Sequence, residues 1–231
     1  MVMFSGSIPG LDKIFIKETD IRRTVLIAGE SGCMKSTFTY SLLSNLLEKT
    51  GEKALYLTLE EGKDSLMANL KSVGATISPN IKIIDYRVIR AQFKSEKQNL
   101  DYIYMIDTLI SSYKRQVGDS FKFIILDSLG ALYSLLAVKD PRSDVYIFFN
   151  LLDEKGLNSF VISERSLLDS SMGTETYLSD GVIELGYLET QRSVKRYIQV
   201  KKMRACHHRM EKFSIEVKED GIHVMGPMYG Y

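Results

Sequence analysis

Residues 24–36 read TVLIAGESGCMKS, and this stretch decides the fold. It opens with a short apolar run, Thr24 to Ala28, and leads into a segment from Ser36 to Lys49 with leucines at positions 42, 43, 46 and 47. An apolar run, a glycine-containing turn and helical spacing predict a strand, a loop and a helix in that order. The loop, Gly29 to Ser36, carries the first glycine, the lysine and the serine of the P-loop pattern.

A P-loop in this position predicts a phosphate-binding site. Its backbone N–H groups curl round phosphates at the positive N-terminal end of the following helix. We expect Lys35 to neutralise the β and γ phosphates of a nucleotide and the Ser36 hydroxyl to hold magnesium. The residues expected to contact the nucleotide are Gly29, Glu30, Ser31, Gly32, Cys33, Met34, Lys35, Ser36 and Thr37. The alternative is an ordinary glycine-rich turn with a surface lysine.

Met34 departs from the P-loop pattern, because it stands where a second glycine is usual. Glycine before the lysine relieves crowding near the phosphate and can adopt a positive φ. Met34 must therefore tolerate or avoid that geometry. This departure leaves a non-hydrolysing, nucleotide-dependent regulator as an alternative to an ATPase.

Apolar strands alternate with helical segments beyond the P-loop. The expected strands are 54–58, 81–85, 121–126 and 160–163, and the expected helices are 64–73, 100–117 and 146–152. This alternation predicts an α/β fold with a central, mostly parallel sheet covered by helices on both faces. Segment 87–99 is polar and weakly periodic, and we expect a mobile surface loop there.

The pattern changes from Gly181 onwards, where short strands follow one another without helices between them. We expect strands at 182–188, 194–202, 213–217 and 222–224. Such a succession predicts antiparallel strands or hairpins at the C-terminal end of the sheet. At 231 residues the chain is read as a single domain, 1–231.

Composition narrows the class of protein. The chain is 45% hydrophobic and 26% charged, as in an average globular domain, and its net charge of +1 gives no global attraction to nucleic acid or anionic membrane. Cys33 and Cys206 form no C-x-x-C pair, and the N-terminus lacks the basic and apolar stretches of a signal peptide. No run is apolar enough for a membrane span. We expect a cytoplasmic protein.

Acidic residues follow two of the expected strands. Asp127 and Ser128 come directly after FIIL at 123–126, an arrangement that places Asp127 at the sheet edge where α/β folds bind ligands and, with Ser36, predicts a magnesium site. Glu60 and Glu61 follow the second strand in the same way, and one of them could polarise the attacking water. The alternatives are a helix N-cap for Asp127 and a solvated turn for the glutamates.

Six segments together resemble the RecA superfamily of ATPases and, within it, the archaeal KaiC-like and RadA-like proteins. They are SIPGLDKIF at 7–15, the P-loop, LTLEE at 57–61, ILDSLGAL at 125–132, ISER at 162–165 and VKKMRACHH at 200–208. They stand in family order and cover nearly the whole chain. The resemblance implies a RecA-like P-loop domain that binds ATP and Mg²⁺.

The resemblance also implies roles for individual residues. One of Glu60 and Glu61 would be the catalytic base. Lys202, Met203, Arg204 and His208 match a segment that reaches the nucleotide of the neighbouring subunit in ring-shaped members, so Lys202 and Arg204 would be trans-acting cations. Ala205 and Cys206 depart from the family's small or hydroxyl residues. The implied partner is a second copy of the chain, in a ring such as a hexamer or in a filament.

Two other interpretations of the C-terminal residues are a metal site and a DNA-binding surface. Cys206, His207 and His208 could suggest a metal site, but consecutive strand residues point to opposite faces. A basic cluster interleaved with Tyr197 could bind DNA, and it comprises Arg192, Lys195, Arg196, Lys201, Lys202, Arg204 and Arg209. We rank a trans-acting cation first, a DNA surface second and a solvated edge third. The expected function is interfacial ATP hydrolysis with a regulatory or signalling role, and a DNA-repair accessory ATPase is the further alternative.

Overall fold

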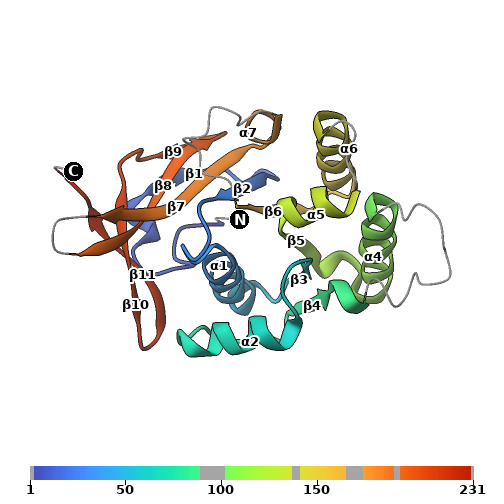
Figure 1. The fold of residues 1–231 in the computed structure, drawn as a ribbon, viewed down its shortest axis with the longest axis horizontal. Helices are drawn as coiled ribbons and strands as arrows, with labels where there is room; N and C mark the ends of the chain where they lie inside the picture. Colours follow the sequence, from blue (N-terminus) through green and yellow to red (C-terminus); the bar gives the residue numbers. More distant parts are fainter. Residues whose placement is uncertain (1–2, 89–101, 137–140, 165–173, 190–192, 230–231) are drawn as a thin grey trace.

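The computed structural model describes residues 3–88, 102–136, 141–164, 174–189 and 193–229. They form a nine-stranded sheet in the order β11-β10-β8-β7-β2-β6-β5-β3-β4 (Figure 1). Its strands are β2 (Thr24–Ala28), β3 (Lys53–Thr58), β4 (Ile81–Asp85), β5 (Phe121–Asp127), β6 (Asn158–Ser163), β7 (Gly181–Glu189), β8 (Val194–Met203), β10 (Phe213–Lys218) and β11 (Gly221–Pro227).

The sheet has a parallel and an antiparallel part. Strands β4, β3, β5, β6, β2 and β7 pair in parallel, whereas β8, β10 and β11 continue the sheet with antiparallel pairs. The predicted α/β fold, with antiparallel strands at the C-terminal end, is therefore confirmed. The change of direction follows the sequence, because each parallel neighbour needs a crossover connection and the antiparallel strands need only turns.

Helices cover both faces of the sheet (Figure 1). On one face, α1 (Lys35–Thr50) and α2 (Lys63–Ser72) pack in one buried cluster, and on the other face α4 (Tyr102–Val117), α5 (Leu129–Leu136) and α6 (Pro141–Glu154) pack in a second. Shorter elements are α7 (Thr174–Leu178) and the 3-10 turns Leu11–Lys13 and Gly118–Ser120. None of the helices in the described ranges is long and apolar enough to cross a membrane.

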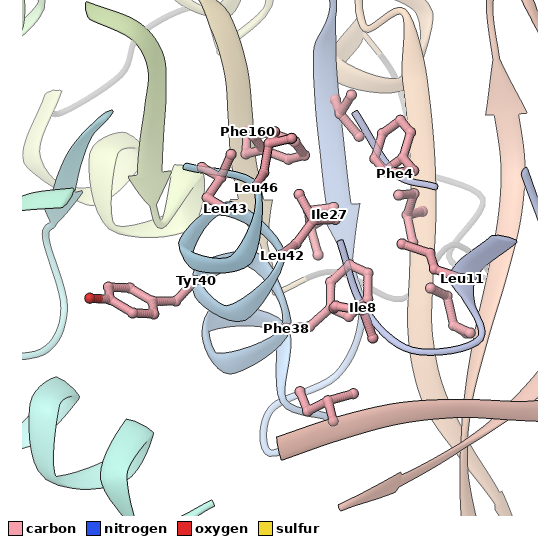
Figure 2. Close-up of a cluster of buried hydrophobic side chains, with 14 of the residues drawn as sticks. Phe4, Ile8, Leu11, Ile27, Phe38, Tyr40, Leu42, Leu43, Leu46 and Phe160 are labelled. Carbon is pink, nitrogen blue, oxygen red and sulfur yellow. The ribbon is translucent and has the colours of Figure 1, made fainter. Parts of the chain in front are cut away.

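The core on the α1 face holds the P-loop helix against the sheet. Figure 2 shows Phe38 and Leu42 of α1 pointing towards Ile27 of β2, with Phe160 of β6 beside Leu46. All five residues of β2 are buried. Full burial of one such apolar side chain contributes about 1.5–3 kcal/mol, so this cluster fixes where α1 begins relative to the end of β2. The loop between them is thus held at both ends.

Two elements that the sequence did not predict form a second, two-stranded sheet. Here β1 (Phe15–Glu18) pairs with β9 (Cys206–His208), and the Glu18 carboxylate accepts hydrogen bonds from the backbone N–H groups of Met3, Phe4 and Ser5. Helices α5 and α7 were also not predicted. The surface loop expected at 87–99 lies outside the described residues, apart from its first two.

Candidate functional site

A cleft of about 650 Å³ opens at the carboxyl ends of β2, β3, β5 and β6. Its walls come from the loop after β2, the acidic turn after β3, the end of β5, the residue after β6, α2 and the antiparallel strands. The lining residues are Ser31, Gly32, Met34, Lys35, Ser36, Thr37, Glu60, Glu61, Leu66, Asn69, Ser72, Val73, Asp127, Glu164, Arg196 and Val217. The volume falls within the usual range of small-molecule sites.

Met34 adopts the geometry that glycine would adopt. Its φ of 72° and ψ of 28° lie in the left-handed region, at the N-cap of α1. This conformation costs a residue with a side chain about 1–2 kcal/mol. The Met34 side chain packs against the core on the α1 face, and this contact offsets part of the cost. The P-loop therefore keeps its expected curl despite the missing second glycine.

The glycines of the loop are required by its close approach to β7. A Cβ on Gly29 would lie 2.0 Å from the carbonyl oxygen of Leu185, and one on Gly32 would lie 3.0 Å from the Tyr187 hydroxyl. Cys33 fills the space beside Gly29, and burial raises the pKa of its thiol. Gly29, Glu30 and Cys33 thus shape the loop from behind and do not line the cleft.

Lys35 begins α1 and lies at the base of the cleft with only 6% of its surface exposed. Its ammonium donates a hydrogen bond to the backbone carbonyl of Glu30, at 2.8 Å. A buried ammonium is costly unless it is paired, and neutral carbonyl contacts compensate it only in part. An anionic ligand in the cleft would supply the missing negative charge.

Ser36 and Asp127 meet at the same edge of the sheet. Both residues line the cleft, and the Tyr56 hydroxyl donates to Asp127 Oδ2 at 2.5 Å. A hydroxyl beside a carboxylate is a donor set that suits Mg²⁺, which prefers oxygen ligands and keeps several waters. The residues therefore fit magnesium. Burial raises the pKa of Asp127, while the hydrogen bonds from Tyr56 and Ser36 act in the opposite direction.

The two adjacent glutamates have different surroundings. Glu60 is exposed in the cleft and accepts a hydrogen bond from the Ser128 hydroxyl. Glu61 accepts hydrogen bonds from Ser65 Oγ at 2.5 Å and Asn69 Nδ2 at 2.6 Å, both on α2. Glu61 is therefore tied to the helix, whereas Glu60 lies next to the Asp127–Ser128 pair.

Several cleft residues were not predicted to belong to a site. Arg196 on β8 had been placed only in the basic cluster, yet it lines the cleft and lies over the Tyr187 ring at 5.7 Å. Val217 of β10 adds an apolar surface. Glu164 was noted only within the ISER segment, where its position directly after a strand was the available signal. Tyr56 is buried and does not line the cleft, but its hydroxyl binds Asp127; it carried no signal, because its strand reads as apolar.

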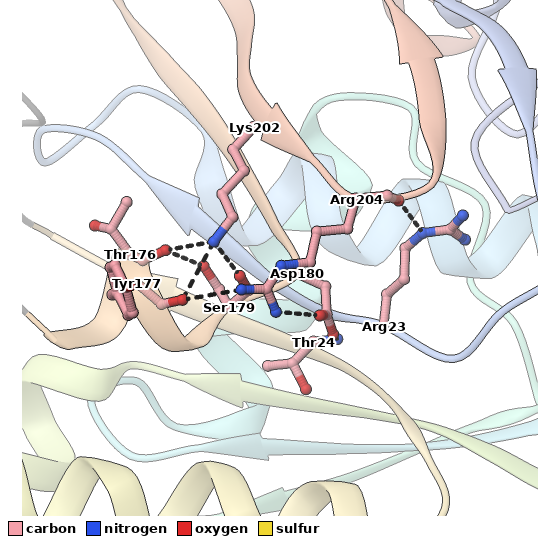
Figure 3. A network of polar contacts seen from close by, with 8 residues as sticks. All are labelled: Arg23, Thr24, Thr176, Tyr177, Ser179, Asp180, Lys202 and Arg204. Carbon is pink, nitrogen blue, oxygen red and sulfur yellow. Dashed lines mark hydrogen bonds and ion pairs between the residues drawn. The ribbon is translucent and has the colours of Figure 1, made fainter.

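Lys202 and Arg204 do not line this cleft. Figure 3 shows the Lys202 ammonium at the end of α7, where it donates to the carbonyl oxygens of Thr176, Tyr177 and Ser179 at 3.0, 3.2 and 2.6 Å. Burial and the nearby Arg204 lower the pKa of Lys202. Arg204 pairs with Asp180 at 2.9 Å, and 53% of its side chain stays exposed.

Strand register places these two cations at the sheet edge opposite the cleft. Gly181 is the partner of Val25, near the start of β2, and Met203 is the partner of Gly181. Since a strand rises about 3.3 Å per residue, the five residues of β2 put roughly 13 Å between the two edges. Lys202 and Arg204 therefore face away from the P-loop of their own chain.

Other residues of the 200–208 segment make contacts within their own chain. The Met203 side chain is buried in the core, and His208 pairs with Phe15 in the two-stranded sheet. The segment Cys206, His207 and His208 is β9, and the described residues contain no cluster of three metal-ligating side chains. The members of the basic cluster also differ in their surroundings. Lys201 pairs with buried Glu184, and Arg192 lies outside the described residues.

Comparisons with known proteins agree with this architecture. The chain matches the family described as "ATPase: KaiC" over residues 4–229. A UPF0273 protein of Thermotoga maritima is 28% identical over 93% of this chain and 92% of its own length. Circadian clock protein KaiC2 of Synechocystis is 27% identical over 94% of this chain, which spans 39% of that longer protein.

A solved structure has the same fold. It is that of the KaiC-like protein PH0186 from Pyrococcus horikoshii OT3, which superposes with a TM-score of 0.74 at 25% identity, over 95% of this chain and 96% of that one. The chain therefore belongs to the KaiC family of ATPases.

Proposed function

We propose that the chain binds Mg-ATP in the cleft and hydrolyses it between subunits, in a regulatory role. The observation that carries this proposal is the convergence of Lys35, Ser36, Asp127 and Glu60 on one cleft from three strand ends. A turn with a chance surface lysine would not bring these groups together. Membership of an ATPase family supports the same conclusion.

Binding is assigned to the P-loop and the walls beside it. The backbone N–H groups of the loop, the N-terminus of α1 and the Lys35 ammonium hold the phosphates. Bound Mg²⁺, held by Ser36 and, directly or through water, by Asp127, would neutralise negative charge on the β and γ phosphates. The base and ribose would lie between α2 and the antiparallel strands, against Val73, Val217 and Arg196.

Hydrolysis is assigned to Glu60. A water oxygen bonds to the γ phosphorus, the bond from phosphorus to the β–γ bridging oxygen breaks, and ADP leaves with the electron pair while Glu60 accepts the proton of the water. Glu60 is favoured over Glu61 because its carboxylate is exposed in the cleft beside Ser128, whereas Glu61 is bound to Ser65 and Asn69 of α2.

The structure suggests separate roles for the two distal cations. Arg204 is the more exposed and would stabilise the developing charge on a neighbouring subunit's triphosphate. The Lys202 ammonium already donates to three backbone carbonyls, so we propose that its role is to hold α7 against β8. Turnover would then depend on assembly, because no chain can bring Arg204 to its own P-loop.

Glu60→Gln and Glu61→Gln form a matched pair that tests the assignment. We expect Glu60→Gln to lower single-turnover phosphate release by about 100-fold or more with little change in ATP affinity, the usual scale of general base catalysis. Glu61→Gln should lower it less than tenfold. Wild-type protein that binds ATP but releases no phosphate over hours would instead favour the non-hydrolysing regulator.

A further inference from the structure

Tyr56 is a tyrosine of β3 whose hydroxyl lies inside the core. The residue is 0% exposed and packs in the buried cluster on the α1 face. A phenylalanine ring would fill the same space, and a buried hydroxyl lowers stability unless it finds a hydrogen-bond partner. The partner here is the Asp127 carboxylate, whose Oδ2 accepts from the Tyr56 hydroxyl at 2.5 Å. The hydroxyl is therefore explained by its bond to Asp127 and not by packing.

The register of the sheet brings these two side chains together. Tyr56 pairs with Ile125, and Thr58 pairs with Asp127, in the parallel ladder of β3 and β5. Because alternate residues of a strand share a face, Tyr56 and Asp127 both project from the face that α1 covers. Asp127 lines the cleft, and Tyr56, further inside the sheet, does not. A ligand of the cleft can thus meet the Asp127 carboxylate while the phenol holds it from within the core.

The backbone of Asp127 is fixed from β3 as well. The Leu59 N–H donates to the Asp127 carbonyl oxygen at 2.6 Å, so only the side-chain torsions of Asp127 remain to be set. A carboxylate that turned freely would have to be ordered each time a ligand bound, and this ordering costs affinity. The hydrogen bond from Tyr56 removes that freedom beforehand. Groups that orient a metal-binding side chain typically contribute a factor of about 10–100 to metal affinity.

We propose that Tyr56 is a positioning residue for Mg²⁺, because its phenol sets the direction in which Asp127 presents its carboxylate to the metal. The inference rests on the proposed function, in which Ser36 and Asp127 hold Mg²⁺, and adds a residue to it. Tyr56 does not line the cleft, so it acts only through Asp127. Removal of the hydroxyl should therefore weaken the magnesium-dependent part of nucleotide binding and leave the metal-free part unchanged.

Calorimetry with a non-hydrolysable ATP analogue, once in EDTA and once in saturating Mg²⁺, separates these two parts. We expect Tyr56→Phe to bind the analogue about tenfold more weakly than the wild type in Mg²⁺, at the lower end of such effects. In EDTA the two affinities should agree within twofold. A substitution that disturbed the fold would lower the affinity in both conditions, so the EDTA measurement also checks that the cleft is intact.

Tyr40→Phe on α1 is the matched control. Tyr40 is also 0% exposed, and its ring centroid lies 6.1 Å from that of Tyr56. Figure 2 shows its ring on the side of α1 away from Ile27. Within the described residues the Tyr40 hydroxyl makes no hydrogen bond to Asp127. Its removal should leave both affinities at the wild-type values, which shows that loss of a buried phenol hydroxyl is not sufficient by itself.

Asp127→Asn tests whether the phenol acts through the carboxylate. In the double variant with Asp127→Asn, Tyr56→Phe should cause no further loss of affinity in Mg²⁺, because the group that it positions is already gone. A further tenfold loss there would overturn the positioning role and leave P-loop binding intact. Wild-type affinity of Tyr56→Phe in Mg²⁺, or an equal loss in EDTA and in Mg²⁺, would have the same meaning.

The wild type distinguishes failure of this inference from failure of the proposed function. A wild-type chain that binds the analogue equally tightly in EDTA and in Mg²⁺ would overturn the magnesium site and the role of Tyr56 with it. A wild-type chain that does not bind the analogue in either condition would overturn the proposed function itself.

Discussion

The two ends of strand β8 carry cations with opposite surroundings. At one end Arg196 lines the P-loop cleft of its own chain and lies over the Tyr187 ring. Just beyond the other end, Arg204 pairs with Asp180 at the far edge of the sheet. The two arginines are close in sequence, and a single antiparallel strand directs them to different places.

The difference shows what an antiparallel strand does to a basic stretch of sequence. A cluster of lysines and arginines at 192–209 looks like one charged surface, as a DNA footprint would. In the fold, one end of β8 lines the cleft, and the other end lies at the opposite edge of the sheet. In a head-to-tail assembly each nucleotide would meet Arg196 from its own chain and Arg204 from the next.

The largest expected effect is at the cleft itself. Lys35→Ala removes the ammonium at the base of the cleft, and we expect it to abolish detectable ATP binding by calorimetry, since contacts of charged groups with phosphate are the strongest available here. Lys202→Ala, at the far edge, serves as the control and should bind ATP as the wild type does. Unchanged affinity in Lys35→Ala would reject the P-loop assignment and with it the contrast between the two edges.

The next effect separates the two arginines. Arg204→Ala should lower steady-state turnover by about 10³-fold while ATP affinity stays constant, because arginines acting in trans contribute on this scale to phosphoryl transfer. Arg196→Ala should instead weaken nucleotide binding about tenfold and lower turnover only at subsaturating ATP.

A mixture of Arg204→Ala with Lys35→Ala also tests whether Arg204 acts on the nucleotide of a neighbouring chain. Turnover restored by mixing supports action between chains, and no recovery with assembled mixed rings would contradict it.

A smaller effect concerns Lys202. Removing its three hydrogen bonds to the end of α7 should lower the free energy of unfolding by about 1 kcal/mol, after allowance for its partial exposure. Urea denaturation of Lys202→Ala measures this loss. Unaltered stability combined with a turnover defect as large as that of Arg204→Ala would mean that Lys202, too, acts on the neighbouring nucleotide.

The parts of the fold that the sequence predicts well depend on local signals. The strand at 24–28, the P-loop and the helix after it were placed to within one residue, because an apolar run, a glycine turn and helical spacing are contiguous. Strands β1 and β9 were missed, since each is short and pairs with a partner far away in the chain. Short strands that form only through distant pairing leave no periodic pattern.

In the candidate site, too, some residues could be predicted from the sequence and their contacts could not. Glu60, Glu61 and Asp127 could be predicted, because each follows a strand and parallel strands end at one edge. The separate surroundings of Glu60 and Glu61 depend on α2 and on Ser128, which spacing does not reveal. Lys202 donates to backbone carbonyls. Every residue has a backbone carbonyl, so the sequence cannot indicate which ones Lys202 contacts.

The smallest expected effect concerns backbone strain at two of the sites where this chain departs from the family pattern. Met34 and Ala205 are the residues other than glycine with positive φ in the described ranges, at 72° and 50°. Ala205→Gly should raise the free energy of unfolding by about 0.5–1 kcal/mol, because glycine relieves the left-handed strain at some entropic cost. For a chain of this length the melting temperature should rise by about 1–4 °C. Met34→Gly should gain less, since it also loses the packing of its side chain against the core. A lower melting temperature in Ala205→Gly would mean that its methyl group, and not only the hydrogen bonds from Thr19 and Arg23, holds the turn in place.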